Sequence, residues 1–231
     1  MAAFPTQTLV SYTALDAQTA SPVQQKLLAF YESNSFYDAA AVADFEVYLA
    51  EQISASTIDI DANLALLKLY SLFPEHLDVD KVAKVLVKGI QALPSTFFTG
   101  ASTVVPESIR EDANVKAVLE AGFLLQSCLF EEFWQVDLTY AKSVAGFTDA
   151  ARAFILDAVR KSHSAISTSV LKAKLNISDK EVQDVVAAEK WSVEGDVIKI
   201  TLNEDNQVRP KKIQENIEFE DVLKVIHTLS R

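Results

Sequence analysis

Apolar side chains recur every three to four residues along the first two thirds of the chain, with polar side chains between them. The clearest example is residues 78–92, where the apolar positions form one helical stripe: Val79, Val82, Ala83, Leu86, Val87 and Ile90. Asp78 and Asp80 lie in the first turn, where a carboxylate interacts favourably with the helix dipole. This spacing predicts an amphipathic α-helix with three lysines on the side away from the stripe: Lys81, Lys84 and Lys88.

Similar patterns predict further helices on either side of this one. Ser21 followed by Pro22 is typical of a helix start, and Pro74 ends a helix that is apolar most of the way round and therefore central. The stretches with helical spacing are residues 36–52, 61–73, 115–123, 130–134 and 151–159. Short helices with short connections indicate antiparallel pairs stacked as a bundle or a short solenoid, although no fixed sequence period is visible.

The pattern changes after residue 163. Two short helices are predicted, at 166–175 and after Ser178, which forms a capping box with Glu181. β-Branched runs then flank Gly195-Asp196, a dipeptide typical of a tight hairpin turn. Together with the helix predicted at 151–159, these elements give three helices followed by a hairpin, which is the order of a winged helix.

The chain therefore divides into four predicted segments. These are a loose N-terminal tail, a helical domain, a winged-helix domain, and a basic hinge with a last amphipathic helix, with boundaries at 1–21, 22–145, 146–208 and 209–231. The fold class that this order predicts is mainly α.

Composition narrows the possible functions. Glycine occurs 5 times in 231 residues, where average usage of about 7% would give roughly 16, so little is available for a phosphate-binding loop. One cysteine and three scattered histidines give no disulfide and no metal-site spacing. The Cys128 thiol is expected to be buried and structural, with Trp134 and Trp191 in the core or at a domain junction.

No apolar run approaches the ~18 residues of a membrane span. We expect a soluble, intracellular, non-catalytic protein without cofactor or metal.

The distribution of charged side chains differs between the first 148 residues and the rest of the chain. Residues 1–148 carry 8 basic and 18 acidic side chains, whereas residues 149–231 carry 13 and 14, and the whole chain has a net charge of −11. The helix at 179–190, which would be the DNA-reading helix of a winged helix, has a net charge of −2. Phosphates would repel it, so sequence-specific DNA binding is not expected. Protein docking through the hairpin edge is the alternative, with Ile198 and Ile200 as candidates.

Two further surfaces are candidates for binding. The last helix has an apolar stripe that must be covered, either by its own winged helix or by a helical bundle with neighbouring subunits: Phe219, Val222, Leu223 and Ile226. Basic residues cluster around the winged helix and could contact RNA: Arg160, Lys161, Lys172, Lys174, Arg209, Lys211 and Lys212. A solvated face is the simpler interpretation of that cluster, and direct RNA contact stays open.

Several ordered segments resemble subunit K of eukaryotic translation initiation factor 3. They cover most of the chain from about residue 36 to 226 and lie at 61–70, 86–94, 128–134, 146–155, 191–192 and 210–219. The resemblance implies a HEAT-like helical domain followed by a winged helix, the PCI layout. It also implies a non-catalytic scaffold subunit that contacts the other subunits of that factor, subunit L above all, and the small ribosomal subunit through the complex. The same layout in another PCI assembly, the proteasome lid or the signalosome, is the alternative.

Overall fold

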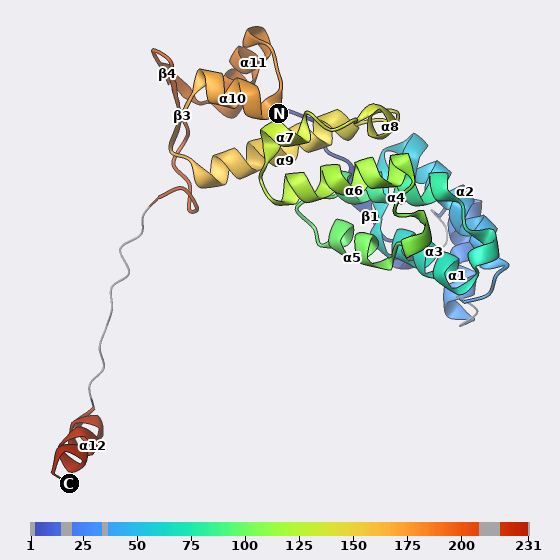
Figure 1. The fold of residues 1–231 in the computed structure, drawn as a ribbon, viewed down its shortest axis with the longest axis horizontal. Helices are drawn as coiled ribbons and strands as arrows, with labels where there is room; N and C mark the ends of the chain where they lie inside the picture. Colours follow the sequence, from blue (N-terminus) through green and yellow to red (C-terminus); the bar gives the residue numbers. More distant parts are fainter. Residues whose placement is uncertain (1–2, 15–19, 34–36, 208–217, 231) are drawn as a thin grey trace.

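The computed structural model describes residues 3–14, 20–33, 37–207 and 218–230, and they are mainly helical. Six helices form the first part of the molecule (Figure 1): α1 Pro22–Glu32, α2 Ala41–Ala55, α3 Ile60–Leu72, α4 Val79–Gln91, α5 Phe97–Val104 and α6 Ala113–Gln126. Neighbours along the chain pack on each other, and α4 lies at the centre, against α2, α3, α5, α6 and the later helix α9. Two single-turn helices follow, α7 Phe130–Phe133 and α8 Thr139–Lys142.

The second part has the predicted winged-helix order. It consists of α9 Phe147–Ser162, β3 Ala165–Ser167, α10 Thr168–Leu175, α11 Asp179–Glu189, β4 Ser192–Glu194 and β5 Val197–Lys199. The strands form an antiparallel sheet in the order β3-β5-β4, in which Ile198 of β5 lies opposite both Ile166 and Val193. Gly195 has a φ of +63° in the turn between β4 and β5, a conformation that glycine adopts without steric cost.

The predicted caps are confirmed because they depend on local chemistry. Ser21 and Ser178 both form capping boxes, with Gln24 and Glu181 as their partners. Asp78, expected in the first turn of α4, is instead its N-cap, and its carboxylate accepts from the Asp80 and Lys81 amides. Each cap satisfies amides that a helix start otherwise leaves without a partner.

Cys128 is exposed, so the expectation of a buried cysteine is wrong. The residue has a φ of +60° just beyond α6. There its amide donates to the Leu125 carbonyl, and the Leu129 amide donates to the Leu124 carbonyl. This pair of bonds is a Schellman motif, which places its left-handed residue at the surface end of a helix.

The N-terminal segment (residues 3–14) lies on the helical part, in contrast to the loose tail expected for residues 1–21. Its strand β1, Thr8–Val10, pairs in parallel with β2, Thr57–Asp59. The Tyr12 side chain is buried, and its amide donates to Asp59 Oδ2 at 2.6 Å. Two three-residue strands almost 50 positions apart give no periodic signal in the sequence.

Lys88 is a third difference from the expected pattern. Its side chain has 0% exposure, although the helical stripe placed it on the polar side of α4. The Lys88 Nζ donates to Gln7 Oε1 at 2.7 Å, to the Thr57 carbonyl at 3.1 Å and to the Gln52 carbonyl at 3.2 Å. The N-terminal segment covers this side of α4 and supplies one of the three acceptors.

Two of the five glycines allow a phenylalanine into the crossing of α4, α5 and α6. Phe98 is fully buried between Gly89 and Gly122. A methyl group at Gly122 would lie 2.0 Å from Phe98 Cζ, and one at Gly89 would lie 3.0 Å from Phe98 Cα. The missing side chains let these helices approach closely.

Candidate interaction surfaces

The last helix, α12 Phe219–Leu229, is exposed along its whole length. It stands apart from the rest of the molecule in Figure 1. The α12 stripe is made of the four predicted residues, Phe219, Val222, Leu223 and Ile226, and all of them are exposed, Phe219 to 76%. Glu220 and Asp221 lie in its first turn. An amphipathic helix of this kind is stable only when its apolar face is covered, so α12 is a candidate docking element.

The sheet edge available for pairing is not the predicted one. Ile198 is completely buried and Ile200 is 4% exposed, and β5 is the central strand, so both of its edges are occupied. Those side chains therefore belong to the winged-helix core. The outer strand β4 carries Val193, which is 55% exposed, and its free edge could accept another strand.

The candidate RNA-contact residues in the described part of the winged helix already have partners. Lys172 Nζ lies 2.7 Å from Asp179, and Lys161 Nζ lies 2.7 Å from Asp157. Lys174 Nζ lies 5.4 Å from the centre of the Phe130 ring. These contacts reduce the charge available to an RNA backbone. Three further candidates, Arg209, Lys211 and Lys212, lie outside the described residues.

Two side chains hold the winged helix to the helical part. Trp134 Nε1 donates to the Lys174 carbonyl at 2.8 Å across the junction, whereas Arg152 of α9 donates from Nη2 to the Asn176 carbonyl at 2.8 Å within the winged helix. The Arg152 guanidinium also lies 5.9 Å from the Phe4 ring centre and 6.0 Å from that of Trp134. Trp134 is therefore a junction residue, and Trp191 is buried.

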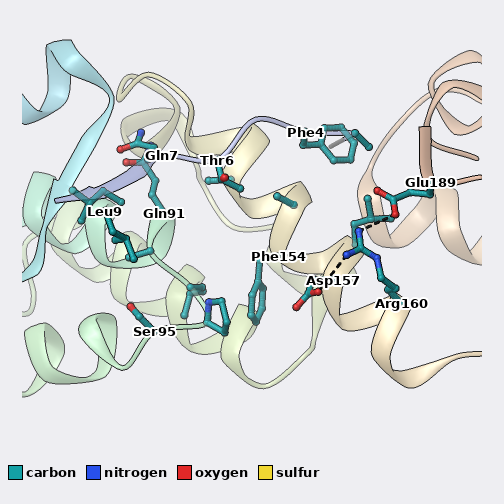
Figure 2. Close-up of a pocket in the computed structure, with 18 residues that line it drawn as sticks. Phe4, Thr6, Gln7, Leu9, Gln91, Ser95, Phe154, Asp157, Arg160 and Glu189 are labelled. Atoms are coloured by element: carbon teal, nitrogen blue, oxygen red, sulfur yellow. Dashed lines mark hydrogen bonds and ion pairs between the residues drawn. The ribbon is translucent and has the colours of Figure 1, made fainter. Parts of the chain in front are cut away.

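A groove of about 430 Å³ runs along α9 at this junction. In Figure 2 the N-terminal segment forms one wall, with Phe4, Thr6 and Leu9, and the connection from α4 to α5, which carries Ser95, forms the other. Phe154 of α9 lies between the walls. Arg160 closes one end, 2.8 Å from Glu189 and 3.7 Å from Asp157. At the other end Gln7 and Gln91 both donate to the Ala145 carbonyl, at 3.1 and 2.9 Å. Nothing in the sequence pattern indicated this groove, because five separate segments line it.

Two buried ionisable groups lie under the N-terminal segment. Burial lowers the pKa of Lys88 to about 8, because no carboxylate offsets the cost of removing the ammonium from water. Burial also raises the pKa of Asp59, although the carboxylate accepts hydrogen bonds from the Ala62 and Tyr12 amides and the Tyr48 hydroxyl. Both groups fix the N-terminal segment to the helices.

Neither a metal centre nor a membrane span emerges from the described residues. No group of three or more His, Cys, Asp or Glu side chains among them could hold a metal ion. Within the same residues no helix is long and apolar enough to cross a bilayer. The features that stand out among the described residues are candidate docking surfaces: an uncovered amphipathic helix, an open strand edge and a groove.

Stacked helices followed by a winged helix define a helical protein of the PCI type. The family model described as the CSN8/PSMD8/EIF3K family matches residues 77–212, more than half of the chain. The chain belongs to this family, and its curated relatives place it with subunit K of eukaryotic translation initiation factor 3.

Three such relatives illustrate the similarity. The Drosophila erecta subunit K is 30% identical over 190 residues, which is 80% of this chain and 86% of the relative. The Xenopus laevis protein is 31% identical over 191 residues, 80% and 87% of the two chains. The human protein is 28% identical over 194 residues, 82% and 89%. The resemblance inferred from the sequence is confirmed.

Proposed function

We propose that this chain is a non-catalytic scaffold subunit of eukaryotic translation initiation factor 3 in the cytoplasm. In this role it binds neighbouring subunits, particularly subunit L, and supports association of the complex with the small ribosomal subunit. The observation that carries the proposal is α12, whose apolar face has no cover among the described residues.

The energetics of α12 favour a helical partner. Residues at i, i+3, i+4 and i+7 form the α12 stripe, the spacing with which a helix enters an apolar groove or bundle. Full burial of each such side chain is worth about 1.5–3 kcal/mol. Together the four side chains would contribute about 6–12 kcal/mol towards the cost of ordering the helix and forming a specific interface.

A second contact would use the winged helix. The free edge of β4 offers backbone donors and acceptors to a strand from a neighbour, and the exposed Val193 side chain would be covered by that strand. We place contact with the small ribosomal subunit at the level of the complex, because candidate residues such as Lys161 and Lys172 are already paired and residues 1–148 are strongly acidic.

Affinity purification of the tagged full-length chain, followed by mass spectrometry, tests this function. We expect initiation-factor subunits, with subunit L prominent, and small-subunit ribosomal proteins. Leu223→Asp should lose these partners, whereas the matched control Val225→Asp, which changes an exposed residue outside the α12 stripe, should keep most of them. Recovery of proteasome-lid or signalosome subunits would reject the proposal and favour the alternative assembly.

A further inference from the structure

We infer that in the free subunit α12 docks into the chain's own groove along α9, and that a partner must displace it. The inference rests on the proposed function, in which partners bind the same apolar face of α12. It joins two surfaces that the described structure leaves uncovered, the α12 stripe and the groove.

The floor of the groove matches a helix in spacing and length. Ala150, Ala153, Phe154 and Asp157 of α9 line it at i, i+3, i+4 and i+7. The two alanines leave room for a second helix to approach closely, and Phe154 offers an apolar contact. The stretch from Ala150 to Arg160 is about 16 Å long at 1.5 Å per residue, and the 11 residues of α12 have the same length.

The walls of the groove are also apolar. Phe4 and Leu9 line the side formed by the N-terminal segment (Figure 2), and the lining residues Leu93 and Pro94 belong to the connection after α4. A helix over α9 would cover the Leu9 side chain, which is now exposed. The α12 stripe and these walls would therefore remove each other's apolar surface from water.

The attachment of the chain places α12 within reach. The loop at 203–207 is held at the closed end of the groove, where Asn203 and Asn206 donate to the Arg160 carbonyl at 2.9 and 3.3 Å. The ten residues from 208 to 217 can span at most about 33–36 Å, about twice the length of the groove. The shortest path brings the N-terminus of α12 to Arg160, so α12 lies antiparallel to α9.

Charges agree with the antiparallel orientation. The first turn of α12 carries Glu220 and Asp221, and the last turn of α9 carries Arg160 and Lys161, whose charges are already paired with Asp157 and Glu189, so this end would add only a weak attraction. The opposite ends would bring His227, in the last turn of α12, towards Asp149, in the first turn of α9. The two helix dipoles would also be antiparallel, which is the favourable arrangement.

Tethering makes a modest affinity sufficient. A short connection gives an effective concentration in the millimolar range, so intrinsic binding with a Kd of about 1 mM would keep α12 docked for a large share of the time. The apparent affinity of a partner would then be its intrinsic affinity multiplied by the fraction of molecules in which α12 is undocked. Docking therefore shields the α12 stripe in the free subunit without preventing assembly.

Spin-label distance measurements on the full chain test the docking. The exposed Cys128 provides one label site, and Thr228→Cys, on the polar side of α12, provides the other. We expect a short, narrow distance population in the free protein. Leu223→Asp should abolish it, whereas the matched control Val225→Asp should keep it. Ala153→Arg, which fills the groove, should also abolish it. If Ala153→Arg does not fold, Thr6→Arg is used in its place, because Thr6 is an exposed residue of the groove wall. The same loss of the short distance is expected.

Affinity for purified subunit L separates this inference from the proposed function. Filling the groove should strengthen binding by about 3- to 10-fold, because the competing site is removed. If Leu223→Asp weakens binding but no variant changes the distances, docking is wrong and the proposed function stands. If the distances respond as expected while Leu223→Asp leaves binding of subunit L unchanged, docking stands and the proposed use of α12 is wrong.

Discussion

Lys88 shows how one residue can make stability depend on pH. Its ammonium is buried with three neutral acceptors, and its pKa is lowered from 10.5 to about 8. Between these values the unfolded chain binds more protons than the folded chain, so the free energy of unfolding should rise with pH. Burial raises the pKa of Tyr12, Tyr48 and Tyr70, which reverses the trend above pH 10. The informative window is therefore pH 8–10.

We predict that Lys88→Met removes this rise. Urea unfolding of both proteins at intervals from pH 7 to 10 should show a steeper increase in the free energy of unfolding for the unchanged chain. Lys84→Met serves as control, because Lys84 lies on the same helix in an exposed pair with Asp80. Parallel pH profiles for the unchanged chain and Lys88→Met would contradict the assigned role of Lys88.

Gly122 makes a second residue-level prediction. The Gly122→Ala variant should lower the free energy of unfolding by about 1–3 kcal/mol, the usual cost of overpacking a core, because the new methyl would lie 2.0 Å from Phe98 Cζ. Gly100→Ala provides the control. Its methyl would have its nearest neighbour at 3.7 Å, and alanine favours a helix by up to about 1 kcal/mol over glycine. Thermal melts should therefore move in opposite directions for the two variants.

At the scale of elements, Tyr12 anchors the N-terminal segment. Tyr12→Ala should cost about 3–5 kcal/mol, as for a buried aromatic residue, because the ring packs edge-on against Phe45 with centres 6.3 Å apart. Hydrogen exchange at the amides of β1 should accelerate as the strand opens. Thr13→Ala, at the exposed neighbouring position, should leave both quantities nearly unchanged. Equal exchange in the two variants would show that β1 does not depend on this anchor.

The elements differ in how far the sequence could predict them. Helices such as α4 and α11 were predictable because their stripes and caps depend on residues within a few positions of each other. The pairing of β1 with β2 was not, because two three-residue strands carry no period. The prediction that Lys88 lies on a solvent-facing side of α4 was wrong for a related reason. A stripe shows which face is most apolar, but α4 is covered on its other side by a segment from far along the chain.

The candidate surfaces divide in the same way. The α12 stripe could be read directly from its spacing, since one helix contains it all. The exposed edge of β4 required the strand order, which places β5 in the middle of the sheet. The groove required the whole fold, since its walls come from the N-terminal segment, the connection after α4, α9 and α11. Surfaces built from distant segments leave no local signature.

At the scale of the whole molecule, the last helix and the body should be separable. Deleting residues 213–231 should leave a monomer with a cooperative melt, because no residue of α12 is buried in the core. The truncated chain should bind neighbouring subunits more weakly. Calorimetry and sedimentation check the fold, and a pull-down with subunit L checks the binding. Loss of the cooperative melt would show that α12 is part of the folded body.

The position of β1 also has a consequence for synthesis on the ribosome. The N-terminal segment leaves the exit tunnel first, but it is held by Thr57, Lys88 and, through Gln7, by Ala145. At about 5–20 residues per second, these partners follow over several seconds to about half a minute. The N-terminal segment is therefore made well before the partners that fix it in place. A fusion at this end would be carried against the junction with the winged helix, where Phe4 meets Arg152.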